Sequence, residues 1–584
     1  MEKRWVLKEL PDNETIERLS KELNINRRLA ALLAQRGITT FDEAKKFFRP
    51  SLQDLHDPFL MKDMDKAVDR ILKAINGGER IMVYGDYDVD GTTAVSLVYN
   101  FLKTLHKKVE FYIPDRYKEG YGISYQGIDT AIEHGATLMI TLDCGIKAVE
   151  KVDYAKKKGL DIIIGDHHRP GDRLPEAVAV LDTKRDDCHY PYDELSGAGV
   201  GFKLTQAIAQ KKGLSEQVVY ESLDLVAVSI AADIVPITGE NRILAYYGLK
   251  QINSKPRPGI LTLLKSAGVK ENPKKEEAYF FDREITISDL VFMLGPRINA
   301  AGRIESAIDS VKLLISKDAE YAEKLGVQIN NMNIYRRDLD RDITKEAIEK
   351  IKSSEALMRK KTTVLYNPEW HKGVIGIVAS RLIENFYRPT IVLTRSDDLV
   401  TGSARSIKQF DIYDAIDSCS HLLEHFGGHT FAAGLAMKPE NLDRFIDCFE
   451  QYAQKHLSDD MMVPEIDVDL DLYVSDINSK FFKILKQFAP FGPGNMSPVF
   501  QSKDLIDTGF AKVVGKNGNA HLKFTVVHLH HSGNPVPAIA FNLGHHIDQI
   551  KEGKSFKICY HITENTWQGT TTLQLRVKDI KFEE

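Results

Sequence analysis

The chain lacks the features that mark secreted, membrane-spanning and disulfide-rich proteins. Its five cysteines among 584 residues are scattered and show no C-x-x-C spacing, which argues against a disulfide framework or a zinc ribbon. It contains no run of about 18 apolar residues that would span a membrane, and the opening segment MEKRWVLKEL has no apolar secretion signal. We therefore expect a cytoplasmic protein with reduced thiols and no membrane contact.

A strong charge of either sign is also missing. The net charge is −5, from 78 Lys and Arg against 83 Asp and Glu. Proteins that coat nucleic acid by bulk electrostatics need an excess of Lys and Arg, so any contact with nucleic acid must come from a local basic groove. The length exceeds what one hydrophobic core can serve, and it predicts roughly three or four domains.

Residues 80–235 alternate short apolar runs with amphipathic stretches. The runs are RIMVYG, VEFYI, TLMITLD, DIIIGD and AVAVLD. This alternation predicts βαβ units and a parallel sheet. Most of the runs end in polar or acidic residues, and ligands bind at the carboxyl ends of the strands in such sheets.

The rest of the chain divides by pattern. Leu339, Ile343, Ala347 and Ile351 form one stripe of a predicted helix. A second α/β pattern follows over about 361–457, and alternating runs such as HLKFTVVHL predict a small β-barrel beyond it. We therefore predict an α/β multidomain protein with a mostly helical segment at 1–70, a parallel-sheet domain at 71–304, a helical connector at 305–358, a smaller α/β domain at 359–458 and a β-barrel at 459–584.

Three carboxylates stand close together in YGDYDVDG, between a predicted strand and a helix expected to begin near Thr92. Like charges so close raise one another's pKa, and a divalent cation such as Mg²⁺ or Mn²⁺ offsets the repulsion. The alternatives are a solvated acidic turn or a calcium loop. An EF-hand would need Glu at position twelve counted from Asp86, where this chain has Leu97.

Three more element ends carry Asp or His. Asp143 ends TLMITLD, Asp166, His167 and His168 end DIIIGDHH, and Asp233 follows LDLVAVSIAA. A histidine pair alone is more often part of a core. Together with the acidic loop, these side chains supply enough ligands for the two-metal arrangement that hydrolyses phosphoesters.

The segments DYDVDG, TLDCG, GDHH and AADIVP, in this order, resemble the four motifs of the DHH phosphoesterase superfamily. The resemblance implies a DHH catalytic domain with two Mn²⁺ or Mg²⁺ ions and no protein nucleophile. The implied metal ligands are Asp88, Asp90, Asp143, His167 and Asp233, with Asp86 as an additional one. It further implies that Asp166 orients a neighbouring histidine, and that His168 binds the second metal or stabilises the scissile phosphate.

Other segments resemble the RecJ family within this superfamily. They are RYKEGYGIS, SGAGVGFKL, GPRINAAGR and FAPFGPGNMSPVF. This resemblance implies a single-stranded-DNA-specific exonuclease that works from the 5′ end and releases 5′-mononucleotides in DNA recombination and repair. The implied partners are single-stranded DNA, a single-strand-binding protein and a RecQ-type helicase.

Candidate substrate contacts come from two regions. In GPRINAAGR, Arg297, Asn299 and Arg303 stand among small residues that permit close approach of phosphate or sugar, although a helix cap with ion pairs is the alternative. HKGVIGIVASRL, TGSARSI and FGGHTFAAG resemble the DHH-associated domain. The candidates there are His371, Arg381, Gly402, Ser403, Arg405, Ser406, Gly427, Gly428 and His429, with Gly427 to His429 expected to form a phosphate-binding turn.

The predicted barrel resembles the oligonucleotide/oligosaccharide-binding (OB) fold of RecJ proteins, which holds single strands by basic tracks and stacking. Its candidate contacts are Lys512, Lys516, His521, Lys523 and Trp567. Ordinary surface or barrel core is the alternative for each of them.

Three other functions remain open from the sequence. A DHH-type nuclease of short oligonucleotides or a cyclic-dinucleotide phosphodiesterase is the main alternative, followed by a pyrophosphatase. Such relatives generally consist of two α/β domains, whereas this chain adds an N-terminal segment and a barrel. A non-catalytic scaffold would have lost metal ligands, and here all of them are present.

Overall fold

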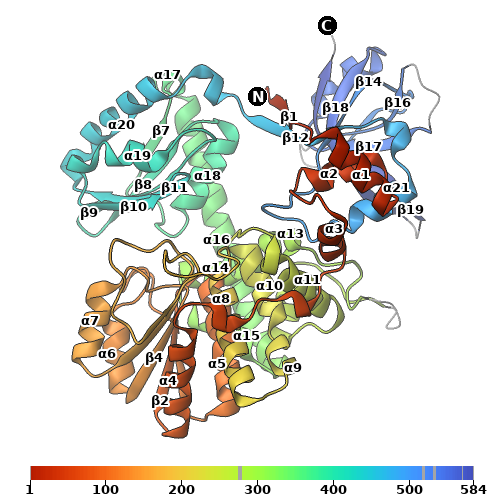
Figure 1. Cartoon of the computed structure of the whole chain (residues 1–584). Coiled ribbons are helices and arrows are strands. Elements are labelled where there is room, and N and C mark those ends of the chain that lie inside the picture. The colour runs from red at the N-terminus through yellow and green to blue at the C-terminus, as the bar shows by residue number, and fades with distance from the viewer. Residues whose placement is uncertain (1, 274–278, 516–519, 530–533, 568–569, 583–584) are drawn as a thin grey trace. The chain divides into compact units, whose positions relative to one another are not determined.

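The computed structural model describes residues 2–273, 279–515, 520–529, 534–567 and 570–582 (Figure 1). The chain forms two compact units. The smaller unit comprises Met1–Leu55, Pro236–Tyr246 and Glu465–Glu584, and the larger unit comprises His56–Val235 and Tyr247–Pro464.

The larger unit contains the predicted parallel sheet, with five strands in the order β3-β2-β4-β5-β6. The strands are β2 (Arg80–Gly85), β3 (Val109–Tyr112), β4 (Ala136–Leu142), β5 (Asp161–Gly165) and β6 (Ala179–Leu181). All neighbouring pairs are parallel, so the carboxyl ends of the strands share one edge.

Helices cover both faces of this sheet. They are α4 (Met64–Asn76), α5 (Val89–Leu105), α6 (Tyr125–Glu133), α7 (Val149–Lys157) and α8 (Gly197–Lys212). Met82 and Tyr84 of β2 share a core with Ile128 of α6 and Val152 of α7. Because the strands are buried on both faces, they are apolar along most of their length and polar side chains are concentrated at their ends.

Further helices follow the sheet in the sequence. They are α9 (Gln217–Tyr220), α10 (Leu223–Ala232), α11 (Gly239–Ser254), α12 (Pro258–Ser266), α13 (Ile287–Asp289), α14 (Gly295–Ile304) and α15 (Ile308–Ile315). Helix α10 is buried from Leu223 to Ala231, and Asp233 forms its C-cap.

The segment predicted as a helical connector contains α16 (Ala319–Lys352), followed by the short helix α17 (Glu355–Arg359). Ile343, Ala347 and Ile351 of the predicted stripe pack in one apolar core with residues of α18 (Ile375–Asn385). The stripe is therefore the face by which α16 packs against the second α/β domain. Figure 1 shows α16 leading up to α18.

That domain has a five-stranded sheet in the order β10-β11-β9-β8-β7. The strands are β7 (Thr363–Tyr366), β8 (Thr390–Ser396), β9 (Leu399–Arg405), β10 (His425–His429) and β11 (Ala432–Met437), with α19 (Ile412–Asp417) and α20 (Leu442–His456). The prediction of a turn at Gly427, Gly428 and His429 is wrong, because these residues lie in β10 and pair with β11. A strand this rich in glycine has little intrinsic preference for the extended state and is held by its partner.

The smaller unit contains the predicted barrel. Its strands are β13 (Leu470–Asp471), β14 (Phe500–Asp507), β15 (Lys512–Val514), β16 (His521–His528), β17 (Val536–Ala540), β18 (Phe556–Trp567) and β19 (Thr570–Phe582). Strand β14 pairs with β18 at one side and with β16 at the other, which closes the sheet on itself.

The N-terminal segment folds with the barrel. Its helices are α1 (Asn13–Leu23), α2 (Arg27–Ala34) and α3 (Phe41–Phe48), and β1 (Arg4–Leu7) pairs in parallel with β12 (Glu465–Val468). Ile16 and Leu29 lie in the same apolar core as Phe500 and Phe524 of the barrel, together with α21 (Ser479–Lys486) and α22 (Ile547–Lys551). Figure 1 shows these red helices beside the blue strands.

Within the described residues, none of the helices combines the length and the apolar character needed to cross a lipid bilayer.

Candidate metal centre

The carboxylates of YGDYDVDG lie where β2 ends and α5 begins. Asp86 follows the strand and is buried. Asp88 is the N-cap of α5, and its carboxylate accepts a hydrogen bond of 3.0 Å from the Gly91 backbone N–H. The helix therefore begins at Val89 rather than near Thr92, because the Asp88 carboxylate satisfies one of the free N–H groups of the first turn.

Asp90 is held by two other helices. Its carboxylate accepts backbone hydrogen bonds from Gly197 at 2.6 Å and from Ala198 at 2.8 Å, at the start of α8. The Ser229 hydroxyl of α10 donates to the same carboxylate at 2.7 Å. Sequence reasoning missed these supports. The only signal for them was the run SGAG, a serine cap followed by small residues.

His167 lies among three carboxylates. Its Nε2 is 3.1 Å from Asp143 Oδ1, 3.5 Å from Asp90 Oδ2 and 3.6 Å from Asp233 Oδ2. Asp143 follows β4 with a left-handed backbone φ of 59°, and His167 follows β5. Side chains from β4, β5, α5 and α10 thus meet at the carboxyl edge of the sheet.

The carboxylates of this cluster are unfavourable as anions. Burial raises the pKa of Asp143 well above its ordinary value, and the charges of Asp90 and Asp88 raise it further. Burial, and next the Asp88 charge, likewise raises the pKa of Asp86. Burial and then Asp90 raise the pKa of Asp233 to about 8. A bound cation would offset this cost, because it favours the ionised form of every carboxylate around it.

The donor set fits Mn²⁺ and Mg²⁺. Two trios of side chains each offer ligand atoms within 4.8 Å of one another, namely Asp143, His167 and His168, and Asp90, His167 and Asp233. Both ions prefer carboxylate oxygens. Burial lowers the pKa of His167, which favours the neutral imidazole that a metal requires.

Asp166 has a different environment from the other carboxylates. It accepts hydrogen bonds from the backbone N–H groups of Ile146, His167 and His168, and from His168 Nδ1 at 2.8 Å. Burial alone would raise its pKa, but the hydrogen bond from His168 and the backbone donors outweigh burial and lower the pKa to about 2. Asp166 therefore stays ionised and fixes the ring of His168, as expected of a residue that orients its neighbour.

Tyr121 also lies at the centre, although sequence reasoning did not single it out. Its hydroxyl is 3.3 Å from His168 Nε2 and 3.4 Å from the Asp143 carbonyl oxygen. Its side chain remains exposed, so it borders the centre from the solvent side. The signal was the GYG triplet within RYKEGYGIS.

A cluster of four arginines, Arg116, Arg303, Arg336 and Arg405, lies where the two α/β domains meet. Burial, and next the charges of the other three, lower the pKa of Arg303 to about 10. Arg303 donates a hydrogen bond of 2.9 Å to the Gly373 carbonyl oxygen, which links α14 to the second domain. Cationic groups whose charges act on one another in this way favour a nearby anion. Arg116 and Arg336 were not predicted.

The neighbours of Arg405 fix its guanidinium in a position that suits such an anion. Its Nη1 donates to the Ser403 hydroxyl at 3.0 Å and to the Ala404 carbonyl oxygen at 2.7 Å. A Cβ at Gly376 would lie 2.8 Å from the Ser403 hydroxyl and 3.0 Å from Arg405 Nη2. The glycine thus allows α18 to approach this pair closely.

Other predicted substrate residues already have partners within the protein. Arg297 donates to Asn330, to the Met293 carbonyl and to the Ser266 carbonyl. Arg381 forms an ion pair of 2.8 Å with the buried Asp340. These two arginines stabilise the connector region. The Ser406 hydroxyl donates to the Phe410 carbonyl, and Asn299 is half-buried on α14.

His429 lies on an exposed strand and close to the metal centre. Burial lowers its pKa, and the charges of Lys147, His168 and Arg169 lower it further. His429 is thus within electrostatic range of the His168 side chain across the two α/β domains. His371 Nδ1, in contrast, accepts a hydrogen bond from the Gly373 backbone N–H in its own loop.

Gly428→Ala is expected to destabilise the second α/β domain by about 2 kcal/mol, as typical of local backbone strain. A Cβ at Gly428 would lie 2.3 Å from the Ala432 carbonyl oxygen and 2.5 Å from Ala433 Cα, across the β10–β11 hairpin. At Gly427 a Cβ would meet nothing within 4 Å. Denaturant unfolding should therefore show a large loss for Gly428→Ala and almost none for Gly427→Ala. Equal losses of stability in the two variants would contradict the close approach of β11 to Gly428.

One face of the barrel carries basic and aromatic side chains together, and we call it the barrel patch. It consists of Lys512, His521, Lys523, Phe541 and Arg576. In the register of the strands, Lys512 lies opposite Lys523, Lys523 opposite Ile539, and Ile539 opposite Arg576. Residues opposite one another on paired strands point to the same face of the sheet, so these side chains share a face. Arg576 lies over the Phe541 ring at 5.4 Å, and His521 contacts its edge.

Two of the predicted barrel contacts are not assigned to the barrel patch. Lys516 lies outside the described residues, and of Trp567 only its place in β18 is described. Phe541 and Arg576 were missed because their approach depends on the pairing of strands that are distant in the sequence.

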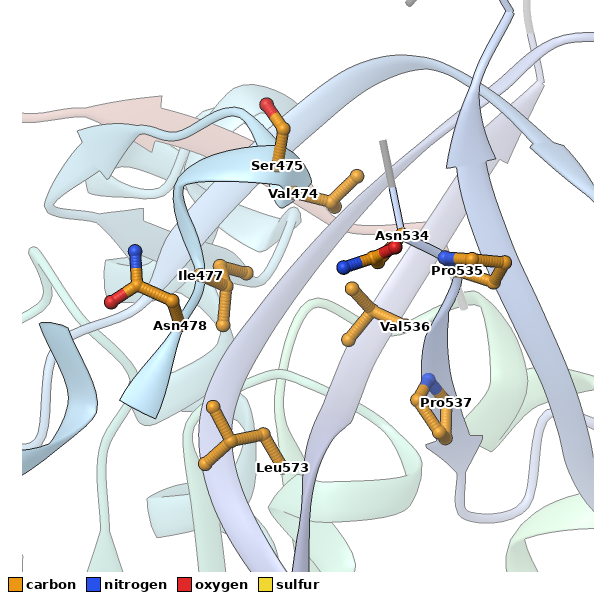
Figure 2. A pocket seen from close by; sticks show the side chains of 9 residues that line it. All are labelled: Val474, Ser475, Ile477, Asn478, Asn534, Pro535, Val536, Pro537 and Leu573. Atoms are coloured by element: carbon orange, nitrogen blue, oxygen red, sulfur yellow. The ribbon is translucent and has the colours of Figure 1, made fainter. Parts of the chain in front are cut away.

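The smaller unit also has a pocket of about 620 Å³ at one corner of the barrel. Figure 2 shows Val474 and Ile477 facing Asn534 and Val536 across it. None of the predicted site residues lines this pocket. We do not assign the functional site to this pocket, because the clustered titratable side chains lie at the metal centre instead.

Family models match most of the chain. They are the DHH family, N-terminal domain, at residues 80–230, the DHHA1 domain at 359–455 and the RecJ OB domain at 468–579.

Curated relatives match over nearly the whole chain. The single-stranded-DNA-specific exonuclease RecJ of Bacillus subtilis (strain 168) is 36% identical over 583 residues, covering 100% of this chain and 71% of the relative. That of Escherichia coli (strain K12) is 31% identical over 576 residues, covering 94% and 95%.

Solved structures agree with this match. The crystal structure of RecJ in complex with Mn²⁺ from Thermus thermophilus is 27% identical with a TM-score of 0.82, covering 100% of this chain and 80% of that one. The corresponding structure with Mg²⁺ is 25% identical with a TM-score of 0.77, covering 100% and 79%.

Proposed function

The chain belongs to the RecJ family of single-stranded-DNA-specific exonucleases, and from this premise we propose that it hydrolyses single-stranded DNA from the 5′ end and releases 5′-mononucleotides. The observation that carries the proposal is the buried cluster in which His167 Nε2 lies within 3.6 Å of three carboxylates. Such a cluster needs cations, and paired cations are suited to phosphodiester hydrolysis.

The residues that would hold two Mn²⁺ or Mg²⁺ ions are Asp86, Asp88, Asp90, Asp143, His167 and Asp233. When bound, the ions would polarise the scissile phosphodiester and activate a water molecule for in-line attack. The α8 N–H groups and Ser229 keep Asp90 aimed at the cluster. No side chain is required as a nucleophile.

His168 and Tyr121 are placed to handle the phosphate. Asp166 holds His168 through Nδ1, which leaves Nε2 free to interact with a phosphate oxygen or with the Tyr121 hydroxyl. Asp166 and His168 therefore act as one unit, with Asp166 as the positioning residue.

The arginine cluster is the proposed receptor for the 5′ phosphate. Arg405 and Ser403 offer a guanidinium fork and a hydroxyl, and Arg303 and Arg116 add charge from the first domain. Guanidinium forks suit phosphate oxygens. A 5′ end fixed there would set the polarity of digestion, with His429 on β10 contacting the strand near the centre.

We propose that the barrel patch binds the part of the DNA strand that lies beyond its 5′ end. Lysines track the phosphates while Phe541 offers a stacking surface, the combination that binds single strands without reading their sequence. A single-strand-binding protein and a RecQ-type helicase would supply such strands during recombination and repair. Recombination and repair act on the chromosome, and these roles therefore favour the predicted cytoplasmic location.

The proposal is tested by digesting end-labelled single and double strands with Mn²⁺, with Mg²⁺ and with a chelator. We expect the 5′ label to leave as a mononucleotide from the single strand alone, and chelator to stop the reaction. Faster cleavage of dinucleotides than of long 5′-phosphorylated strands would instead support the short-oligonucleotide alternative. An inert protein would support a binding scaffold.

A further inference from the structure

Two cysteines that are far apart in the sequence lie side by side in the second α/β domain. Cys419 and Cys448 are 29 positions apart, and their sulfur atoms are 2.6 Å from each other. Non-bonded contacts between carbon atoms, which are smaller than sulfur, are about 3.5–4.0 Å. The separation is closer to the disulfide bond length of about 2.05 Å.

The elements around the two cysteines hold them in this position. Cys419 follows α19 and is fully buried, with the Ser418 hydroxyl 3.6 Å from its sulfur. Cys448 lies on α20 and is half-buried. Both pack in the same apolar core with Phe445 and Phe449 of α20. The approach is therefore set by the packing of α20 against the α19 segment.

We propose that Cys419 and Cys448 are a site of reversible covalent modification, at which mild oxidation forms an intramolecular disulfide. The other three cysteines belong to other domains, Cys144 at the metal centre, Cys188 in the first domain and Cys559 in the barrel. No sulfur–sulfur approach of this kind joins them in the described part of the chain. A cytoplasmic disulfide is normally transient.

The chemistry needs a peroxide as oxidant. The Cys448 thiolate, the more accessible of the two, attacks one oxygen of hydrogen peroxide and becomes a sulfenic acid, while the other oxygen leaves as hydroxide and takes up a proton to give water. The Cys419 sulfur then attacks the sulfenic sulfur. The S–S bond forms, the S–O bond breaks, and a second water leaves with the Cys419 proton. Two thiols and one peroxide thus give one disulfide and two waters.

The cross-link would enclose the β10–β11 hairpin. Residues 420–447 contain both strands, including Gly428 and His429, and none of the proposed metal ligands. Oxidation would therefore restrain the strand that carries His429 and leave the carboxylate cluster chemically unchanged. The reaction does not depend on nuclease activity, so its failure and that of the proposed function can be told apart.

The test treats the full chain with increasing hydrogen peroxide, blocks free thiols with N-ethylmaleimide and maps the peptides by mass spectrometry. We expect a Cys419–Cys448 linked peptide that has lost two hydrogen atoms and that dithiothreitol reverses. Once Cys448 is a sulfenic acid, Cys419 should capture it at least about tenfold faster than any other thiol captures a Cys188 sulfenic acid, because its partner is already in place. Oxidation should raise the unfolding temperature of this domain by roughly 5–10 °C.

Matched variants separate this outcome from general oxidation. Cys448→Ser, at a half-buried position, should abolish the linked peptide and the temperature shift, as should Cys419→Ala, while Cys188→Ser should leave both unchanged. The proposal is overturned if Cys188 enters disulfide-linked peptides as fast as the pair, or if Cys448 advances to a sulfinic acid without any linked peptide.

Discussion

Asp143→Asn is expected to lower the rate of DNA hydrolysis by about 1000-fold or more while binding of single-stranded DNA is retained. Asp143 Oδ1 lies 3.1 Å from His167 Nε2, and Asp143 belongs to one of the two trios that offer metal ligands. Charge stabilisation by a metal contributes several kcal/mol to the transition state, and each 1.36 kcal/mol is a factor of about ten in rate. Asparagine keeps the shape of the side chain and removes its charge.

The measurement is single-turnover release of a 5′ label at saturating Mn²⁺, with binding of the same strand followed by fluorescence anisotropy. Asp172→Asn provides the matched control, because Asp172 is exposed in the loop that follows His168. It should leave the rate within a factor of about two, as expected for a surface change. A normal rate in Asp143→Asn would remove the carboxylate cluster from the mechanism.

Arg405→Ala is expected to lower kcat/KM for 5′-phosphorylated strands by about 100-fold, and to change the value for 5′-hydroxyl strands only slightly. Arg405 donates a hydrogen bond to the Ser403 hydroxyl, and Gly376 of α18 packs closely against both side chains. Each hydrogen bond to a charged group contributes about 1.5–3 kcal/mol, and a guanidinium offers two in parallel to a phosphate. The difference between the two substrates therefore isolates the terminal phosphate.

Two further variants complete this experiment. Arg395→Ala removes an exposed arginine from β8 in the same sheet and should leave both substrates unaffected. Arg405→Lys keeps the charge and loses the fork, so it should restore only part of the preference. If Arg405→Ala weakened both substrates equally, Arg405 would be a general DNA contact and the proposed origin of the polarity would fail.

The side chains predicted as metal ligands could be selected from the sequence because most of them stand at the ends of strands. Strand ends are local features, since an apolar run of five or six residues followed by Asp or His needs no knowledge of distant partners. Asp143 after β4 and His167 after β5 were placed in this way. The hydrogen bonds that hold Asp90 were not predictable, because Gly197 and Ser229 lie 107 and 139 positions further along the chain.

The substrate residues show where such reasoning stops. Arg297 and Arg303 look alike in GPRINAAGR, yet α14 turns Arg297 toward Asn330 and Arg303 toward Gly373. Which of the two guanidinium groups remains available to the substrate depends on its tertiary partners, and the residue type alone does not indicate these partners. The same limit applies to β10, whose Gly-Gly-His sequence has the composition of a turn but is extended by pairing with β11.

The shared core of the N-terminal helices and the barrel bears on how this protein is made. The residues up to Leu55 pack with a region that begins at Glu465. At roughly 5–20 residues per second, the ribosome needs on the order of half a minute to synthesise what lies between. The helices before Leu55 are therefore synthesised well before their partners, and their apolar faces are open to chaperones until the barrel is complete.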